Sequence, residues 1–142
     1  MGGNPTLPPE MVTAYFSWAA WEAFVRRAGI TIDRPYGSRH PAFPEIVYPM
    51  NYGFVNDTTS SDTKEVDIFK GTVDNGLVGL IMTHDWHRKD SEMKLLFNCS
   101  PEEIYLALGF VNFDRRLMEG TLALRRPMRE LWVGERSGKP RP

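Results

Sequence analysis

The chain has 142 residues, of which 42% are hydrophobic and 25% are charged, and its formal net charge is −1. This size suits one domain with its own core, and the balanced charge argues against a nucleic-acid-binding surface. No apolar run reaches the roughly 18 residues of a membrane-spanning helix, and no secretory signal is visible. Cys99 is the single cysteine, so the chain cannot form an internal disulfide. We therefore expect a cytoplasmic protein without nucleic-acid or membrane partners.

The first predicted element is a helix over residues 10–28, after a Gly- and Pro-rich start (residues 1–9) that we expect to be loosely ordered. Pro8 and Pro9 suit the first turn of this helix, and Gly29 suits its stop. Its aromatic residues are Tyr15, Phe16, Trp18, Trp21 and Phe24. So much aromatic surface has to be buried. We expect the helix to pack on the domain or to join two copies in a homo-oligomer.

A short strand is predicted over residues 29–33, and a proline-rich loop follows it. Four prolines from Pro35 to Pro49 keep this loop extended or turning rather than helical. The loop region carries Arg34, Arg39 and His40. Arginine binds phosphate through two parallel N–H groups, so this region is a candidate phosphate contact. The alternative is a solvated loop whose arginines pair with nearby carboxylates.

Residues 45–69 form the stretch around which the chain is organised. An aromatic-rich run with Tyr48 and Tyr52 is followed by a polar loop over residues 56–64. Residues 65–69 then alternate charged and apolar side chains, which predicts a half-buried strand. A strand, a turn and a second strand would bring Tyr48, Tyr52, Asp62 and Asp67 to one end of a sheet. Phenols and carboxylates there suit a hard cation and phosphate oxygens.

Two further strands are predicted at residues 77–83 and 91–97. The loop between them is dense in polar side chains, namely His84, Asp85, His87 and Asp90. Alternation in the second strand places Glu92 and Lys94 on one face, and the loop brings Asp85 near them. The histidines also raise a zinc or other transition-metal site as an alternative, but His-x-x-His in a loop is weak evidence for one.

A capping box at residues 100–103 predicts a helix that runs to about Glu119, with Gly120 as its stop. Its expected core-facing residues are Ile104, Leu108, Val111 and Leu117. A last strand is predicted over residues 121–126, and residues 134–142 are expected to be loosely ordered. The order of elements favours a mainly β, α+β single domain over residues 1–142. It suits a small antiparallel barrel with helices packed outside.

The motif Tyr-Pro-x-Asn-Tyr-Gly at residues 48–53, followed by a loop and Asp67, resembles the soluble magnesium-dependent inorganic pyrophosphatases. The family pattern after this motif is Asp-Gly-Asp-Pro-x-Asp, and here the same window is Asp-Thr-Lys-Glu-Val-Asp at residues 62–67. The outer aspartates match. Lys64 replaces the middle one, which in the family helps to activate the attacking water. The resemblance covers residues 32–94 and implies a five-stranded Greek-key, OB-like barrel over residues 30–126, with the site at one end.

The resemblance also implies an activity, a cofactor and a set of site residues. The activity is hydrolysis of pyrophosphate to two phosphates by water activated by Mg²⁺, with Mn²⁺ as a substitute. The implied catalytic residues are Asp67, Lys94 and Tyr52. The implied substrate contacts are Arg34, Arg39, Tyr48 and Lys64. The implied metal ligands are Asp62, Asp67, Asp85, Glu92 and Asp33, with Asp90 as an alternative to Glu92.

Lys64 leaves three interpretations open, because an ammonium group cannot ligate a metal and repels one at short range. Glu65 or Glu92 supplies the missing carboxylate, and pyrophosphate is hydrolysed slowly or with an altered metal demand. Alternatively, Lys64 contacts phosphate directly, and the substrate is a different phosphoanhydride or a phosphate ester. In the third interpretation the site is inactive, and the domain binds a phosphorylated ligand or a partner.

Overall fold

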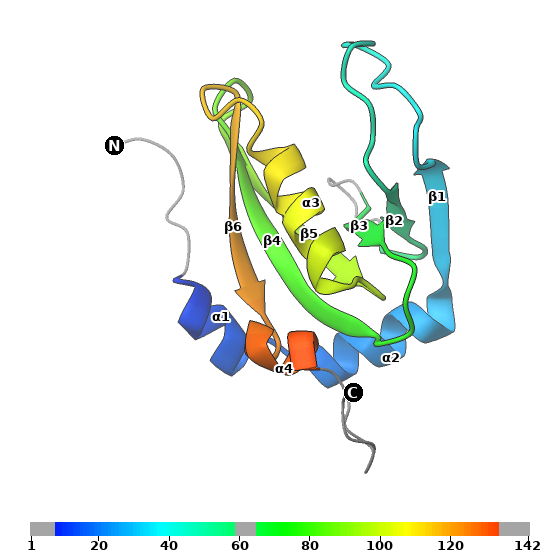
Figure 1. The fold of residues 1–142 in the computed structure, drawn as a ribbon, viewed down its shortest axis with the longest axis vertical. Helices are drawn as coiled ribbons and strands as arrows, with labels where there is room; N and C mark the ends of the chain where they lie inside the picture. The colour runs from blue at the N-terminus through cyan, green and yellow to red at the C-terminus, as the bar shows by residue number, and fades with distance from the viewer. Residues whose placement is uncertain (1–7, 59–64, 134–142) are drawn as a thin grey trace.

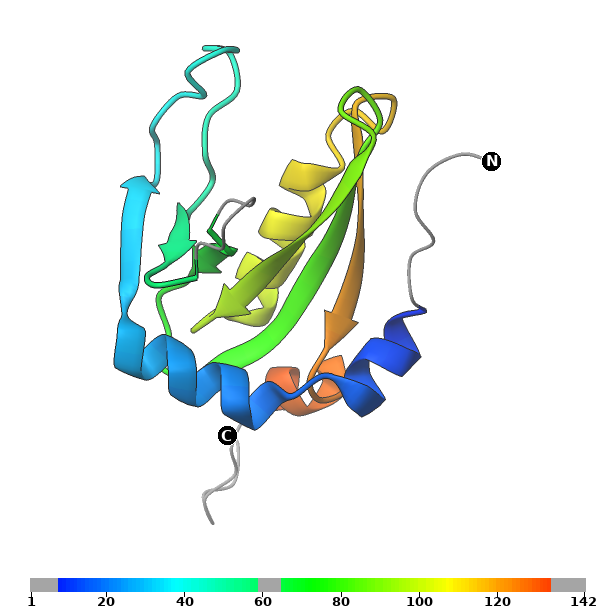
Figure 2. The ribbon, with the colours of Figure 1, turned by 180° about the vertical axis from the view of Figure 1, so that it is seen from behind.

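The computed structural model describes residues 8–58 and 65–133, which form a mixed sheet with helices on both faces (Figures 1 and 2). The strands are β1 (Ile30–Arg34), β2 (Asn51–Val55), β3 (Asp67–Lys70), β4 (Leu77–Asp85), β5 (Asp90–Phe97) and β6 (Met118–Leu124). The helices are α1 (Pro9–Tyr15), α2 (Trp18–Ala28), α3 (Pro101–Val111) and α4 (Met128–Val133). The expected α+β class is confirmed.

The strands lie in the order β1-β2-β3-β5-β4-β6, and the described pairings are antiparallel except that β3 runs parallel to β5. Within the described residues β1 and β6 are the two edges, so the sheet is open and has six strands. The five-stranded closed barrel that we expected is not what these strands form. The edge at β6 is held instead by α1, where Thr13 Oγ1 donates a hydrogen bond to the carbonyl oxygen of Leu124 at 2.7 Å.

The sheet separates two apolar cores, because alternate residues of a strand point to opposite faces. On one face Ile68, Leu80 and Leu95 pack with Val25 of α2 and its neighbours. On the other face the core residues from the sheet are Phe69, Ile81 and Leu96, and those from α3 are Ile104 and Ala107. Figure 1 shows α3 lying across the front of the sheet, and Figure 2 shows α1 and α2 along the back. Asp67 and Lys94 share the α3 face, two residues from Phe69 and Leu96.

The predicted N-terminal helix is two helices in the structure, so the single helix over residues 10–28 was wrong. The chain becomes extended at Phe16, with φ −70° and ψ 143°. This break places the Phe16 ring against Trp18, at 4.7 Å between ring centroids, and against Trp21, at 6.1 Å. Trp18 and Val25 are buried on the protein's own sheet. The aromatic surface is therefore covered largely within the chain, and a homo-oligomer through this helix stays a prediction.

The capping box of α3 is present as predicted, but the helix ends at Val111 rather than near Glu119. Ser100 Oγ accepts a hydrogen bond from the backbone N–H of Glu103, whose carboxylate accepts one from the backbone N–H of Ser100. At the other end the Asn112 side chain bonds both backbone groups of Gly120, at 2.9 and 3.1 Å. These bonds attach the end of α3 to β6, which makes Gly120 a strand residue rather than a helix stop.

The C-terminal part differs from the prediction in three further respects. Strand β6 begins at Met118, three residues earlier than expected, and Leu117 before it is exposed rather than core-facing. The short helix α4, which follows Pro127, was not predicted.

The ends predicted to be loose, residues 1–7 and 134–142, lie outside the described residues. None of the helices in the described part of the chain has both the length and the apolar character needed to cross a lipid bilayer.

Candidate functional site

Tyr52, Asp67 and Lys94 come together from three adjacent strands. Lys94 Nζ donates hydrogen bonds to Asp67 Oδ2 at 2.8 Å and to Tyr52 Oη at 2.9 Å, and Tyr52 Oη donates to Asp67 Oδ2 at 2.6 Å. The parallel register of β3 and β5 sets Asp67 directly beside Lys94. Tyr52 lies on β2, opposite Phe69 in the pairing with β3. Its hydroxyl group contacts both Asp67 and Lys94. The three residues that the sequence assigned to catalysis are therefore in mutual contact.

Glu92 joins this group from the same face of β5. Its Oε1 lies 3.3 Å from Lys94 Nζ. We call Tyr52, Asp67, Glu92 and Lys94 the Lys94 cluster. An ammonium group has three N–H donors, and here three oxygens accept them. The Lys94 side chain is 7% exposed, whereas Asp67 and Glu92 are 28% and 32% exposed. A buried cation thus lies beneath two carboxylates that reach the solvent.

The cluster fixes the protonation of its two buried members. Burial alone would lower the pKa of Lys94, but the oxygens of Tyr52 and Asp67 stabilise the ammonium form and raise that pKa above its usual value. Burial also raises the pKa of Tyr52; Lys94 opposes this effect, and the Asp67 carboxylate adds to it. At neutral pH the cluster therefore holds a charged lysine and a protonated phenol.

An aromatic layer supports the cluster and carries two predicted substrate contacts. Tyr48 stacks on Tyr52 with 5.3 Å between ring centroids, and Arg34 Nη1 donates to Tyr48 Oη at 2.8 Å. Phe110 of α3 packs against the Tyr48 ring at 5.0 Å. Tyr48 is buried, and the Arg34 guanidinium lies over its ring at 5.6 Å. Arg34 is thus held beside the cluster by Tyr48, which is itself a supporting residue.

The backbone packing explains why the last residue of the Tyr-Pro-x-Asn-Tyr-Gly motif, Gly53, is a glycine. It lies in β2 opposite Ile32 of β1, and a Cβ atom there would overlap the carbonyl oxygen of Thr31. Only glycine lets the two backbones approach this closely. The glycine therefore determines how closely β2 approaches β1, and with it the position of Tyr52, the residue before it.

None of the following hydrogen bonds and ion pairs, made by other predicted site residues in the described part of the chain, joins them to the cluster. Asp85 Oδ1 accepts the backbone N–H groups of His87 and Arg88 at 2.9 Å, so this carboxylate shapes the β4–β5 turn. Asp90 pairs with Arg88 at 3.3 Å in the same turn. Arg39 donates to the carbonyl oxygen of Pro44 within the exposed β1–β2 loop. Asp33 is exposed on β1, and the described residues show no contact between it and the cluster.

The predicted metal site can be tested only in part. Asp62 and Lys64 lie outside the described residues. Within residues 8–58 and 65–133, no group of three or more His, Cys, Asp or Glu side chains could together hold a metal ion. His84 instead bonds Ser91 Oγ at 3.1 Å and packs edge-on against Trp86. What the described residues offer is the pair Asp67 and Glu92, and magnesium in proteins commonly uses one or two carboxylates, several waters and substrate phosphates. That pair fits such a shared site.

Phe110 is a site residue that the sequence analysis missed. Its ring contacts Tyr48 and lies 6.3 Å from Phe69, so α3 closes the aromatic layer over β2 and β3. Helical spacing could have indicated it, since Phe110 lies three residues after the buried Ala107.

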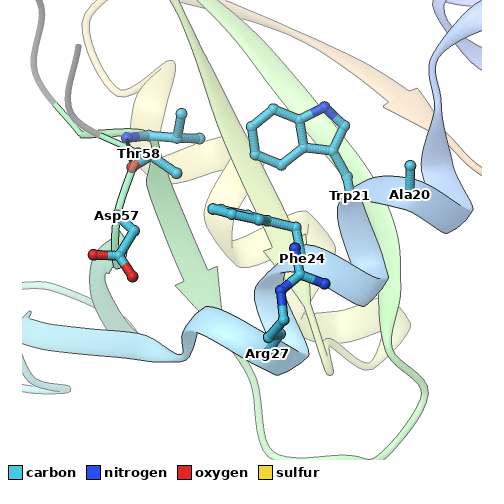
Figure 3. A pocket seen from close by; sticks show the side chains of 7 residues that line it. Ala20, Trp21, Phe24, Arg27, Asp57 and Thr58 are labelled. Atoms are coloured by element: carbon cyan, nitrogen blue, oxygen red, sulfur yellow. Dashed lines mark hydrogen bonds between the residues drawn. The ribbon is translucent and has the colours of Figure 1, made fainter.

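A pocket on the opposite face of the sheet contains none of the predicted site residues. Its volume is about 470 Å³, and it is lined by Ala20, Trp21, Phe24, Arg27, Asp57, Thr58 and Val66. Figure 3 shows Trp21, Phe24 and Arg27 projecting from α2, with Asp57 and Thr58 across from them. Val66 packs against the core on the α2 face, whereas Asp67 lies on the α3 face. The candidate site is therefore the Lys94 cluster and not this pocket.

Comparisons with known proteins find similarity among solved structures. No protein-family model matches the chain, and no curated protein matches it. Among solved structures, it is similar to the crystal structure of inorganic pyrophosphatase from Thermus thermophilus, with 16% sequence identity and a TM-score of 0.44. The similarity covers 73% of this chain and 86% of that one. At this identity and TM-score, the likeness carries no argument about activity.

Proposed function

We propose that the chain is a Mg²⁺-dependent phosphohydrolase that cleaves pyrophosphate into two phosphates. The observation that carries this proposal is the Lys94 cluster, in which a buried ammonium group holds two solvent-reaching carboxylates from neighbouring strands. Lys94 supplies one positive charge to two carboxylates, so the formal charge of the cluster is −1 and a further cation would be attracted to it. The same arrangement, opened to solvent on one side, suits a substrate made of phosphate oxygens and a hard cation.

Asp67 and Glu92 would hold the cation, with waters and phosphate oxygens as its remaining ligands. Bound Mg²⁺ would neutralise charge on the phosphates and lower the pKa of a coordinated water. Asp67 would orient that water and accept its proton. Its Oδ2 is engaged by Tyr52 and Lys94, and the described residues supply no partner to Oδ1. The second oxygen would therefore be the one that contacts a ligand.

Tyr52 and Lys94 would act by position and by charge. The phenol donates to Asp67 and accepts from Lys94, which fixes the carboxylate in one orientation. The longest of the three ammonium contacts is the one to Glu92, at 3.3 Å. An incoming phosphate oxygen would replace this contact most easily, so Lys94 would stabilise charge that develops on the leaving phosphate. Arg34, held by Tyr48, would supply a second cation at the same edge.

The test is phosphate release from pyrophosphate with Mg²⁺, with Mn²⁺ and without metal, for the unmodified protein and Asp67→Asn. We expect metal-dependent release that falls by at least about 100-fold in Asp67→Asn, since general-base catalysis contributes about 10²–10⁴-fold. Asp74→Asn is the matched control, because Asp74 is exposed on the loop after β3. Equal release from Asp67→Asn and the unmodified protein would remove Asp67 from the site.

A second candidate function is binding of a phosphorylated ligand without turnover. It is favoured by Lys64 in place of the family's central aspartate and by the two-carboxylate donor set of the described residues. Both candidates predict that pyrophosphate raises the melting temperature, and only the enzyme predicts release. In both, Asp67→Asn is expected to abolish stabilisation by Mg²⁺. No release together with a melting shift would select the binding function, and the absence of both would exclude the two.

A further inference from the structure

The β1–β2 loop (residues 35–50) projects beyond the ends of its two strands (Figure 1). Its two limbs are joined by backbone hydrogen bonds. The N–H of Tyr48 donates to the carbonyl oxygen of Ser38, and that of His40 donates to Ile46, each at 2.9 Å. An isolated bridge joins the limbs between these two bonds. The limbs are therefore paired as far as His40, and residues 41–45 form the tip of the loop.

His40 closes this tip through its side chain. Its Nδ1 atom accepts hydrogen bonds from the backbone N–H groups of Ala42, at 3.0 Å, and Phe43, at 3.2 Å. A ring nitrogen that accepts hydrogen bonds carries no proton, so this ring is neutral and its proton is on Nε2. A protonated ring has a second N–H in place of that acceptor. The conformation of the tip therefore depends on an unprotonated Nδ1.

The His40 ring also extends the aromatic layer of the candidate site. It lies parallel to the Tyr48 ring, with an interplanar angle of 5° and 6.3 Å between ring centroids. On the loop itself, Phe43 packs against it at 5.4 Å. Tyr48 in turn stacks on Tyr52 of the Lys94 cluster and accepts the hydrogen bond from Arg34. A continuous column of rings thus connects the tip of the loop with the cluster.

The surroundings of His40 favour its neutral form. Burial lowers the pKa of His40 below its usual value of 6.5, and the Arg34 guanidinium lowers it further, whereas the Glu45 carboxylate opposes both effects. Tyr48 meets the ring with its face. Arg39, the residue before His40, donates to a backbone carbonyl group of the loop. Protonation would therefore break both Nδ1 bonds and place a second cation near Arg34.

We propose that His40 is a pH-dependent switch, whose neutral ring holds the tip of the β1–β2 loop on Tyr48 and whose protonated ring releases it. Release would uncover one face of Tyr48, the side chain that holds Arg34 beside the cluster. The inference goes beyond the proposed function, because it concerns the loop and its tests do not measure turnover. A protein without pyrophosphatase activity could still have the switch, and an active one could lack it.

The experiment is nuclear magnetic resonance of the full isotope-labelled chain between about pH 8 and about pH 5, the range in which histidine titrates. At the upper end we expect a His40 ring protonated on Nε2 alone, with nuclear Overhauser effects to the Tyr48 ring. As the ring takes up its second proton, these effects are expected to disappear. The protection of the Ala42 and Phe43 amides, measured against unstructured peptides, is expected to be lost in the same transition.

Three variants separate titration of His40 from other effects of acid. In His40→Asn the side-chain Oδ1 can accept the same two N–H bonds but does not titrate, so protection should persist across the range. His40→Ala has no acceptor and should show the released tip already at about pH 8. His87→Asn, in the exposed β4–β5 turn, is the matched control and should keep the response of the unmodified protein.

Three results would overturn the proposal. The first is a His40 ring protonated on Nδ1 at the upper end of the range, which would contradict its role as an acceptor. The second is protection of Ala42 and Phe43 that does not change with pH in the unmodified protein. The third is an unchanged pH response in His40→Asn. The first two are measured on the unmodified protein, so they hold even for variants that fail to fold.

Discussion

Lys94 connects three strands through one ammonium group, and this makes the cluster sensitive to the loss of any member. All three of its N–H groups have acceptors, and its side chain is almost fully buried. Removing one acceptor would leave a buried donor without a partner, which costs about 1–3 kcal/mol. Within the described residues no buried side-chain nitrogen or oxygen lacks a hydrogen bond. The cluster therefore supports the fold as well as any chemistry.

Tyr52 gives the protein a pH dependence at alkaline pH. Its pKa is raised from 10.0 on folding, so above about pH 10 the folded protein keeps a proton that the unfolded chain has released. The free energy of unfolding then falls as the pH rises, by at most about 1.4 kcal/mol per pH unit for this group. Lys94, whose pKa is also raised, contributes with the same sign above its usual value of 10.5.

We expect the Tyr52→Phe variant to lose stability less steeply than the unmodified protein between pH 9 and pH 11. Urea unfolding at several pH values measures this slope. Tyr105→Phe is the matched control, because Tyr105 is exposed on α3 and its slope should equal that of the unmodified protein. Identical slopes in all three proteins would contradict the assigned role of Tyr52.

At the scale of elements, the two helix starts at Ser17 and Ser100 differ in a way that can be measured. Ser100 caps α3 through its hydroxyl, whereas Ser17 precedes α2 without a side-chain capping bond. Ser100→Ala should therefore lower the free energy of unfolding by about 1 kcal/mol, and Ser17→Ala should change it much less. Urea unfolding midpoints of the two variants provide the comparison. Equal losses would mean that the cap is not what stabilises α3.

Elements whose signal is local were predictable, and those set by distant contacts were not. The capping box of α3 and the alternation of faces in β5 depend on neighbouring residues, and both are present: Leu95 and Phe97 lie in one core and Leu96 in the other. The break at Phe16 depends on its packing against Trp18 and Trp21. The end of α3 depends on bonds between Asn112 and Gly120. No periodicity within either helix encodes such contacts.

At the scale of the whole molecule, the reactivity of the buried Cys99 thiol can be used to measure opening of the core between the sheet and α3. Its side chain has no exposed area, and burial raises the pKa of its thiol to about 12. We expect negligible reaction with a thiol reagent at pH 8 in the native state, and full reaction once urea unfolds the domain. Asp74→Cys, which places a thiol on an exposed loop, should react at once and serves as the control. Rapid labelling of native Cys99 would show that this core opens without global unfolding.

The site was predictable within one strand and not where it depends on which strands pair. Alternation placed Glu92 and Lys94 on one face of a strand, and both lie in the cluster. Asp67 was joined to them only through the family resemblance, because the parallel pairing of β3 with β5 was not predicted. Asp85 was assigned across the loop between two strands, and in the structure its carboxylate accepts hydrogen bonds within the β4–β5 turn. The five-stranded closed barrel was wrong for a related reason, because local patterns predict individual strands but not which strand edges pair.

The parallel pairing of β3 with β5 has a consequence for how the protein folds. Strands β4 and β5 are joined by a short turn and can pair early, and β6 can add to β4. Strand β3 can join β5 only after the intervening chain has crossed over, which brings Asp67 to Lys94 from 27 residues away. Non-local pairings of this kind form slowly. We therefore expect the cluster to assemble at a late step, so that a chain that stalls before this step would have much of its sheet but no site.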